Sequence, residues 1–152
     1  MEGSTEGVEL HIRDVLAEDA PAICQINREA LGYEFPLPDT LAQLERVIKA
    51  PNVVLLVAVD GTEVLGYVQL SDYENTYHRP LKNLITLAIS PRHQRRGVGR
   101  ALLTAGEEWA RADGASGVRL VTGHNRVDAR EFYAANGYEV RKEQTNLIKW
   151  WN

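Results

Sequence analysis

A basic turn that contains two glycines joins two apolar segments between residues 87 and 103. This turn holds no acidic residue, and its glycines and cations are Arg95, Arg96, Gly97, Gly99 and Arg100. The apolar spacing that follows predicts a helix, and the first N–H groups of a helix are unpaired at the positive end of its dipole. Such a helix start binds phosphate, and glycine lets a phosphate approach closely because it lacks a Cβ atom. The turn is therefore a candidate phosphate site, to which the arginines add positive charge.

Two better-known phosphate loops are excluded by their spacing. A Walker loop requires Gly-x-x-x-x-Gly-Lys-Ser/Thr, which the chain lacks. The dinucleotide fingerprint requires Gly-x-Gly-x-x-Gly/Ala, but the corresponding segment, Gly97–Leu102, ends in leucine. A nucleic-acid patch is disfavoured because no aromatic residues alternate with the arginines and the net charge is -4. The remaining alternative is a capped helix whose basic turn is only solvated.

Three segments of the chain resemble one known family. Gln94–Gly99 matches the Gln/Arg-x-x-Gly-x-Gly/Ala pyrophosphate motif of the GNAT superfamily of acyl-CoA-dependent N-acetyltransferases, and it follows Pro91 and an apolar strand. Ala129–Tyr138 is similar to the family's Ala-x-x-Phe/Leu-Tyr-x-x-x-Gly-Phe/Tyr signature, and residues 12–20 are similar to its opening strand and helix. The order of the expected elements also resembles that of the family, from residue 9 to residue 149.

This resemblance implies a fold of the α/β (α+β) class, with a mixed, mostly antiparallel twisted sheet flanked by helices on both faces. It also implies an acyltransferase that moves the acetyl group of acetyl-CoA to a primary amine by direct attack in a ternary complex. We expect a small-molecule amine in preference to a protein N-terminus or a lysine, and polyamines, amino acids and aminoglycosides stay open as acceptors. The alternative is a module that binds acyl-CoA as a sensor without turnover.

The resemblance implies the acetyl-CoA contacts residue by residue. The strand residues Leu87, Ala88 and Ile89 would border the pantetheine arm, which pairs with the backbone of Leu87 and Ile89 like an added strand. Backbone amides of the turn would hold the pyrophosphate, from Gln94, Arg95, Arg96, Gly97, Val98, Gly99 and Arg100. Asn125 stands close to the place of a cofactor-binding asparagine in the family, but one residue further from the family's tyrosine, so Arg126 is the alternative.

Acetyl transfer requires a positioned amine, a hydrogen-bond donor and a proton source. Holding a neutral amine near the thioester carbonyl lowers the barrier, because the translational and rotational entropy of the amine is already lost on binding. A backbone N–H near Ile89 would stabilise the negative charge that develops on the carbonyl oxygen. By the resemblance, Tyr133 points at the CoA sulfur, and its hydroxyl would protonate the departing thiolate. The alternative role of Tyr133 is packing beside Phe132.

The identity of the general base stays open at the level of sequence. Many family members place a glutamate on the strand that corresponds to residues 118–122, where this chain has no acidic residue. We expect Glu34 or His78 to accept the proton of the amine. The further candidates, beside a chain of waters, are Asp72, Glu74 and His124. Segments 33–38 and 72–78 combine aromatic residues with carboxylates, so they suit a cationic amine and should line its groove.

Periodicity predicts the elements that must position these residues, in the order β-α-α-β-β-β-α-β-α-β-β. The expected strands are 9–13, 53–59, 64–70, 83–90 and 118–122, the expected helices are 23–31, 40–48, 98–112 and 128–136, and a hairpin over 138–151 closes the order. Thr40 with Gln43 resembles a capping box, and the two prolines of 33–38 predict a non-helical connection. Asp60-Gly61 predicts a hairpin turn.

The composition fits one domain. We expect residues 1–8 to be a flexible segment and residues 9–152 a single N-acetyltransferase domain, since 152 residues leave little room for a second. The single cysteine fits a reducing cytoplasm, and no apolar run approaches the ~20 residues that span a bilayer. The histidines and the cysteine show no metal-ligand spacing, so we expect no metal, and we expect neither a membrane nor a nucleic-acid partner. Trp150-Trp151 suits a homodimer interface.

Overall fold

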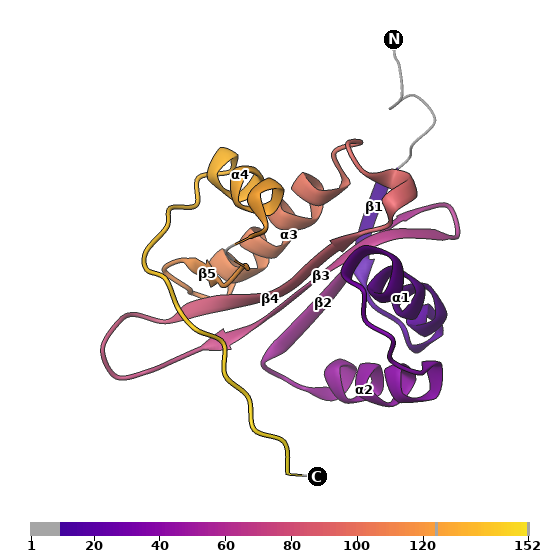
Figure 1. Ribbon diagram of the computed structural model, residues 1–152, viewed down its shortest axis with the longest axis horizontal. Helices are drawn as coiled ribbons and strands as arrows, with labels where there is room; N and C mark the ends of the chain where they lie inside the picture. Colours follow the sequence, from indigo (N-terminus) through magenta and orange to yellow (C-terminus); the bar gives the residue numbers. More distant parts are fainter. Residues whose placement is uncertain (1–9, 124, 152) are drawn as a thin grey trace. The chain divides into compact units, whose positions relative to one another are not determined.

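The computed structural model describes residues 10–123 and 125–151 (Figure 1). These residues form two compact units, which divide between Val121 and Thr122. The first unit contains, in chain order, β1 (Leu10–Asp14), η1 (Ala17–Asp19), α1 (Ala20–Ile26), η2 (Asn27–Leu31), α2 (Leu37–Lys49), β2 (Val53–Asp60), β3 (Glu63–Tyr73), β4 (Leu81–Ile89), η3 (Pro91–His93), α3 (Val98–Ala112) and β5 (Val118–Leu120). The second unit contains α4 (Val127–Ala135). Within the described ranges no helix is long and apolar enough to cross a membrane.

The first unit is built on a five-stranded sheet in the order β1-β2-β3-β4-β5. Neighbours from β1 to β4 are antiparallel, whereas β5 runs parallel to β4. The hairpin of β2 and β3 turns at Gly61, whose φ is 63°, as Asp60-Gly61 predicted. A left-handed backbone at this position favours glycine. The expected mixed, mostly antiparallel sheet is confirmed.

Helices cover both faces of this sheet (Figure 1). On one face, called the α1 face below, α1 and α2 pack against β2, β3 and β4 through a core that includes Ile23, Leu44, Val57, Tyr67 and Ala88. On the opposite α3 face, Gly106 of α3 lies so close to Leu70 of β3 that an added Cβ atom would stand 2.8 Å from the leucine Cδ1. Each helix turns its apolar stripe to the sheet, which agrees with the spacing that predicted it.

An ion pair with a buried carboxylate fixes the passage from β1 to α1. Arg13 Nη1 and Nη2 donate to the two carboxylate oxygens of Asp19, at 2.9 Å each, and the Leu16 N–H donates to Asp19 Oδ2 at 2.8 Å. Asp19 is 5% exposed. Burial by itself would raise the pKa of Asp19, but the bonds from Arg13 and Leu16 outweigh it and lower that pKa. The carboxylate therefore stays ionised in the core.

The start of α2 differs from the prediction. The helix begins at Leu37 with Pro36 as its N-cap residue, and Pro38 lies in its first turn. Proline is tolerated there because its missing N–H would have no helical partner anyway. The Thr40 hydroxyl does not cap the helix but donates to the Pro36 carbonyl oxygen at 3.0 Å. The predicted capping box and the predicted non-helical path through Pro38 were therefore wrong.

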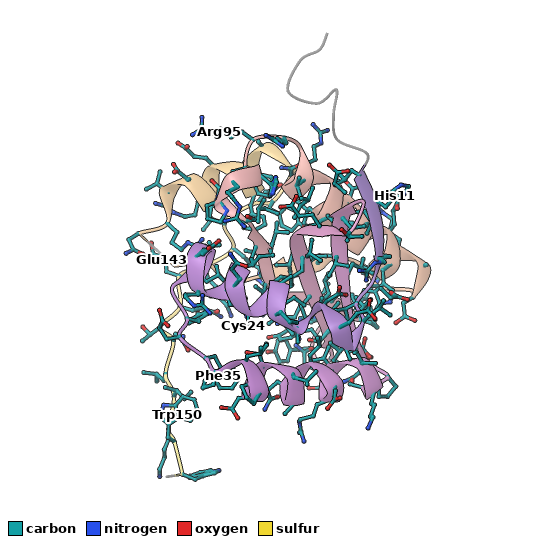
Figure 2. All side chains as sticks on the ribbon, turned by 90° about the vertical axis from the view of Figure 1, so that its right-hand side faces the viewer. His11, Cys24, Phe35, Arg95, Glu143 and Trp150 are labelled. Atoms are coloured by element: carbon teal, nitrogen blue, oxygen red, sulfur yellow. The ribbon has the colours of Figure 1, made fainter. Side chains whose placement is uncertain are left out.

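The second unit consists of α4 and an extended segment. α4 ends before Gly137, whose φ is 93°, as predicted, and the Tyr138 N–H donates to the Tyr133 carbonyl oxygen at 2.9 Å. The described residues 138–151 form no helix or strand, so the predicted closing hairpin was wrong. A hairpin alone is marginal in water unless another surface covers its apolar side. The apolar side chains here are exposed, with Trp150 at 76% (Figure 2).

Candidate active site

The turn between β4 and α3 holds an uncommon run of backbone conformations. After η3, Gln94 is extended, Arg95 has a φ of 65° and Gly97 has a φ of 81°. Arg95 is the one non-glycine residue with a positive φ in the described part of the chain. Such strain concentrates at functional sites because the surrounding structure must hold it. Figure 2 shows the Arg95 side chain projecting outward from this turn.

The N-terminal end of α3 is uncapped. Gly97, the N-cap residue, has no side chain that could bond to the helix, and the first turn carries no acidic residue. The first intrahelical bond runs from the Ala101 N–H to the Gly97 carbonyl oxygen at 3.0 Å. The N–H groups of Val98, Gly99 and Arg100 therefore have no partner within the helix. The helix start predicted from the sequence is confirmed, and the exposed cations around it are Arg95, Arg96 and Arg100.

β4 is paired with β5 along only part of its length. The register joins three residues of β4, Lys82–Leu84, to β5, and no strand among the described residues pairs with the rest of that edge. The Ser90 N–H donates to the Leu65 carbonyl oxygen of β3 at 2.8 Å. Because the backbone groups of a strand point alternately to its two sides, those of Leu87 and Ile89 point away from β3. This open edge of β4 leads directly into the turn.

A β-bulge changes the face to which the side chains of β4 point. The register of β4 against β3 passes over Ile85, which is thus an extra residue. Before the bulge Lys82 lies on the α3 face, where its ammonium is 4.5 Å from the centre of the Trp109 ring. After the bulge Ala88 lies in the core of the α1 face. Thr86 shares that face, because alternate residues of a strand point the same way.

Three polar side chains form a line on the α1 face beside the open edge. Tyr67 is 5% exposed, and its hydroxyl donates to Asn27 Oδ1 at 2.6 Å. The Thr86 hydroxyl bonds to the same tyrosine side chain. Burial raises the pKa of Tyr67 to about 12, against the lowering effect of the bonds to Thr86 and Asn27. Sequence reasoning missed this line. The available signal was a tyrosine within an apolar strand, since a buried phenol needs a hydrogen-bond partner.

Asn27 also begins η2, a π-helical turn that follows α1. Such turns are rare and frequently mark functional sites. The turn ends at Gly32, whose φ is 79°, as the sequence predicted. Arg92 Nη1 of η3 donates to Glu29 Oε1 of η2 at 3.3 Å. The connection from α1 to α2 and the basic turn before α3 are therefore neighbours.

Comparison with known proteins identifies the family. Residues 20–138 match the model of the Acetyltransferase (GNAT) family. The chain belongs to the GNAT family. An uncharacterised N-acetyltransferase of Bacillus subtilis, YhfO, is 29% identical over 91% of this chain and 94% of its own length. The aminoglycoside N(6')-acetyltransferase type 1 of Stenotrophomonas maltophilia is 31% identical over 82% of this chain and 81% of its own length.

A solved structure has the same fold. An aminoglycoside N-acetyltransferase in complex with CoA matches with a TM-score of 0.83 at 19% identity, over 95% of this chain and 97% of the other. The resemblance to GNAT enzymes, the mixed fold and the class of N-acetyltransferase are thus confirmed.

The structure does not bring the two predicted bases of this GNAT protein together. Glu34 follows η2 and is 80% exposed, with its carboxylate 3.9 Å from Arg28 Nε. His78 lies in the loop between β3 and β4, which Figure 1 draws at the opposite end of β4 from the basic turn. The nine residues of β4 span roughly 30 Å at about 3.3 Å per residue. The loop of His78 is therefore remote from the end of β4 that leads into the basic turn.

Hydrogen bonds determine the tautomer of His78. Asn75 Oδ1 accepts from the backbone N–H groups of Tyr77 at 3.0 Å and His78 at 3.2 Å. The amide nitrogen of Asn75 is therefore the atom that lies 2.7 Å from His78 Nε2, and it donates to that ring nitrogen. His78 Nδ1 then carries the hydrogen, which it donates to the Arg79 carbonyl oxygen at 2.8 Å. The lone pair that a base would use is already shared with Asn75.

The other candidate bases are placed as follows. Asp72 accepts a hydrogen bond from Lys82 Nζ at 2.5 Å, and Asp113 accepts one from the same ammonium. Burial would lower the pKa of Lys82, but the bonds to Asp113 and Asp72 outweigh it and raise that pKa. Asp72 is therefore part of an ion-pair cluster between β3, β4 and the end of α3. Glu74 is exposed, and His124 lies outside the described residues.

The second unit of this GNAT protein carries Tyr133 on α4. The Tyr133 ring lies edge-to-face against Phe132 at 5.3 Å and against Tyr138 at 5.6 Å between ring centres. Burial raises the pKa of Tyr133, although Arg126 has a lowering effect. The hydroxyl is therefore protonated at neutral pH. Asn125 is exposed and precedes Arg126, the N-cap residue of α4.

Proposed function

We propose that this GNAT protein transfers the acetyl group of acetyl-CoA to the primary amine of a small molecule, by direct attack in a ternary complex. The observation that carries the proposal is the continuity between the open edge of β4 and the uncapped start of α3. An extended ligand with a diphosphate at one end and an amide-bearing arm fits such a surface. The free N–H groups and arginines suit the diphosphate, and the unpaired strand edge suits the arm.

The proposed cofactor contacts follow the backbone. The pyrophosphate would lie against the amides of Gln94–Arg100, where the arginines reduce the cost of its charge. The pantetheine arm would run along Leu87–Ile89 and pair with the groups that point away from β3. Asn125, or Arg126 beside it, is proposed as a further contact.

The proposed reaction is a single transfer. The amine nitrogen attacks the thioester carbonyl carbon, the C–S bond breaks, and Tyr133 gives its hydroxyl proton to the leaving thiolate. A backbone N–H near Ile89 would donate to the carbonyl oxygen while negative charge develops there. Because burial raises the pKa of Tyr133, its hydroxyl carries at neutral pH the proton that this role requires.

Glu34 is favoured over His78 as the base that takes the proton of the amine. The Glu34 carboxylate is exposed and lies 3.9 Å from Arg28 Nε. Glu34 also follows η2, which a hydrogen bond from Arg92 joins to the basic turn. His78 shares its lone pair with Asn75 and lies at the far end of β4. Proton loss through a chain of waters is the alternative.

A small cationic amine is the proposed acceptor. Tyr33 and Phe35, on either side of Glu34, are 64% and 47% exposed. Aromatic faces next to a carboxylate attract an ammonium group through cation–π and charge contacts. The aminoglycoside acetyltransferase of Stenotrophomonas maltophilia, which acts on a compound of this class by its name, supports the same choice.

Release of CoA thiol from acetyl-CoA, measured across a panel of aminoglycosides, polyamines and amino acids, tests the proposal. We expect at least one amine to raise thiol release above the rate without amine, and its product to gain one acetyl group in mass spectrometry. Gly99→Glu, which puts a side chain and a negative charge at the phosphates, should abolish both acetyl-CoA binding and turnover. If the wild type binds acetyl-CoA but acetylates no amine, the proposed reaction is wrong and a sensor role takes its place.

A further inference from the structure

The line of hydrogen bonds through Tyr67 has a direction. The Tyr67 hydroxyl carries one hydrogen, which it donates to Asn27 Oδ1 at 2.6 Å. The Thr86 hydroxyl must therefore donate its own hydrogen to the Tyr67 oxygen, and its lone pairs are left as acceptors. With a pKa of about 12, Tyr67 is uncharged at neutral pH, so the line keeps this direction.

The position of Thr86 on β4 places these lone pairs beside the open edge of the sheet. Thr86 follows Ile85, the extra residue of the bulge, and precedes Leu87, whose backbone points to the open edge. Its side chain lies on the α1 face, together with Tyr67. The Tyr33 N–H donates to the Asn27 carbonyl oxygen at 3.0 Å. The same asparagine therefore anchors both the polar line and the start of the aromatic segment before α2.

We propose that Thr86 Oγ1 accepts a hydrogen bond from the N–H of the substrate's primary amine, and that Tyr67 and Asn27 are positioning residues that hold the Thr86 hydroxyl in its accepting orientation. The inference rests on the proposed function and names one contact of its acceptor site. A hydrogen bond from the amine N–H to Thr86 fixes the orientation of the amine nitrogen. The nitrogen lone pair is then free to face the thioester carbonyl carbon held along β4. An uncharged oxygen also stabilises an ammonium less than a carboxylate does, so it favours the neutral, nucleophilic amine.

Two substitutions at Thr86 test the contact. Thr86→Val keeps the shape of the side chain and removes the hydroxyl, whereas Thr86→Ser keeps the hydroxyl. With an amine that the wild type acetylates, Thr86→Val should lower kcat/KM for the amine about 3- to 10-fold, the size of one neutral hydrogen bond. The KM for acetyl-CoA should not change, and Thr86→Ser should keep most of the wild-type rate. Thr104→Val, at an exposed position of α3, is the matched control and should change neither value.

Tyr67→Phe separates positioning from packing. Phenylalanine keeps the buried ring but removes the oxygen to which the Thr86 hydroxyl donates. We expect kcat/KM for the amine to fall, and the double variant Tyr67→Phe/Thr86→Val to be no worse than Thr86→Val alone, because both changes act through one contact. Losses that simply add would mean that Tyr67 supports the fold independently, and would overturn its positioning role.

The outcomes distinguish this inference from the proposed function. An unchanged kcat/KM for the amine in Thr86→Val would overturn the contact while the acetyltransferase reaction stands. A raised KM for acetyl-CoA in that variant would also overturn it, since Thr86 would then act on the cofactor. If the wild type turns over no amine at all, the proposed function fails, and the inference fails with it.

Discussion

Left-handed glycines stand at both ends of α3, which allows a matched test of the phosphate-binding turn. Gly97 precedes the helix with a φ of 81°, and Gly114 follows it with a φ of 86°. A Cβ atom added at either position would meet nothing within 4 Å. Alanine therefore costs only backbone strain, about 1–2 kcal/mol for a left-handed residue. We expect Gly97→Ala and Gly114→Ala to lower the free energy of unfolding by similar amounts.

Only one of the two substitutions should affect acetyl-CoA. At Gly97 the new Cβ atom would stand beside the free N–H groups that the proposed phosphates approach, so it should keep the phosphates from approaching closely. The loss of one hydrogen bond to a charged phosphate, about 1.5–3 kcal/mol, corresponds to roughly 10- to 100-fold weaker binding. Gly114 lies at the other end of a helix of 15 residues, so Gly114→Ala should bind like the wild type.

Urea unfolding of the free proteins measures the first effect, and calorimetric titration with acetyl-CoA measures the second. Equal affinity of the two variants for acetyl-CoA would refute the assignment of the turn. A loss of stability in Gly97→Ala much larger than in Gly114→Ala would refute the claim that strain alone acts at both ends.

Three further predictions concern charge and proton transfer. Lys82→Met should lower the free energy of unfolding, measured in urea, by about 1–3 kcal/mol. This loss is smaller than for a fully buried pair because the Asp72 and Asp113 side chains are 32% and 59% exposed. The control Lys49→Met, at an exposed position, should change this free energy little. Asp19→Asn should cost about 1–3 kcal/mol at pH 7. Because Arg13 helps to lower the pKa of Asp19, the difference in free energy of unfolding between Asp19→Asn and the wild type should be complete above the ordinary aspartate pKa of about 3.9. It should shrink as the pH falls below that value, since Asp19 is then protonated. A difference that stays constant in acid would contradict the ion pair. Tyr133→Phe should lower kcat by ~10²-fold and leave the KM for acetyl-CoA unchanged. This loss is near the low end for a general acid because a CoA thiol resembles cysteine, whose pKa is about 8.5, and is a fair leaving group. Activity within about two-fold of wild type at pH 7 would mean that Tyr133 only packs and does not act as the general acid.

Features that depend on local chemistry could be predicted from the sequence. The turns at Gly61, Gly97 and Gly137 all have a left-handed backbone, which glycine adopts without strain, and each was predicted as a boundary. The start of α3 was predictable as well, because the apolar spacing after the turn and the missing acidic residues are both local properties. Of these features, Gly97 and the start of α3 belong to the proposed phosphate site.

Features that depend on pairing between distant residues could not be predicted. The hydrogen bond from Tyr67 to Asn27 joins residues 40 positions apart, and neither residue type indicates which partner it will have. The predicted hairpin over 138–151 needed a surface to cover its apolar side, which no local pattern reveals. α2 begins earlier than predicted because proline, which is excluded from the interior of a helix, is tolerated in its first turn.

The bulge at Ile85 links the two proposed halves of the site. In a regular strand Lys82, Thr86 and Ala88 would share one face, and the extra residue reverses this alternation, so that Lys82 faces α3 while Thr86 and Ala88 face α1. The backbone is reversed in the same way. The Lys82 N–H donates to the Gly117 carbonyl oxygen on the β5 side at 3.0 Å, whereas beyond the bulge Ser90 donates to β3. Without the bulge, Thr86 would face α3 and its own backbone would point to the open edge. One extra residue therefore places the open backbone edge of Leu87 and Ile89, where the cofactor is proposed to bind, next to the Thr86 hydroxyl, the proposed contact of the acceptor amine.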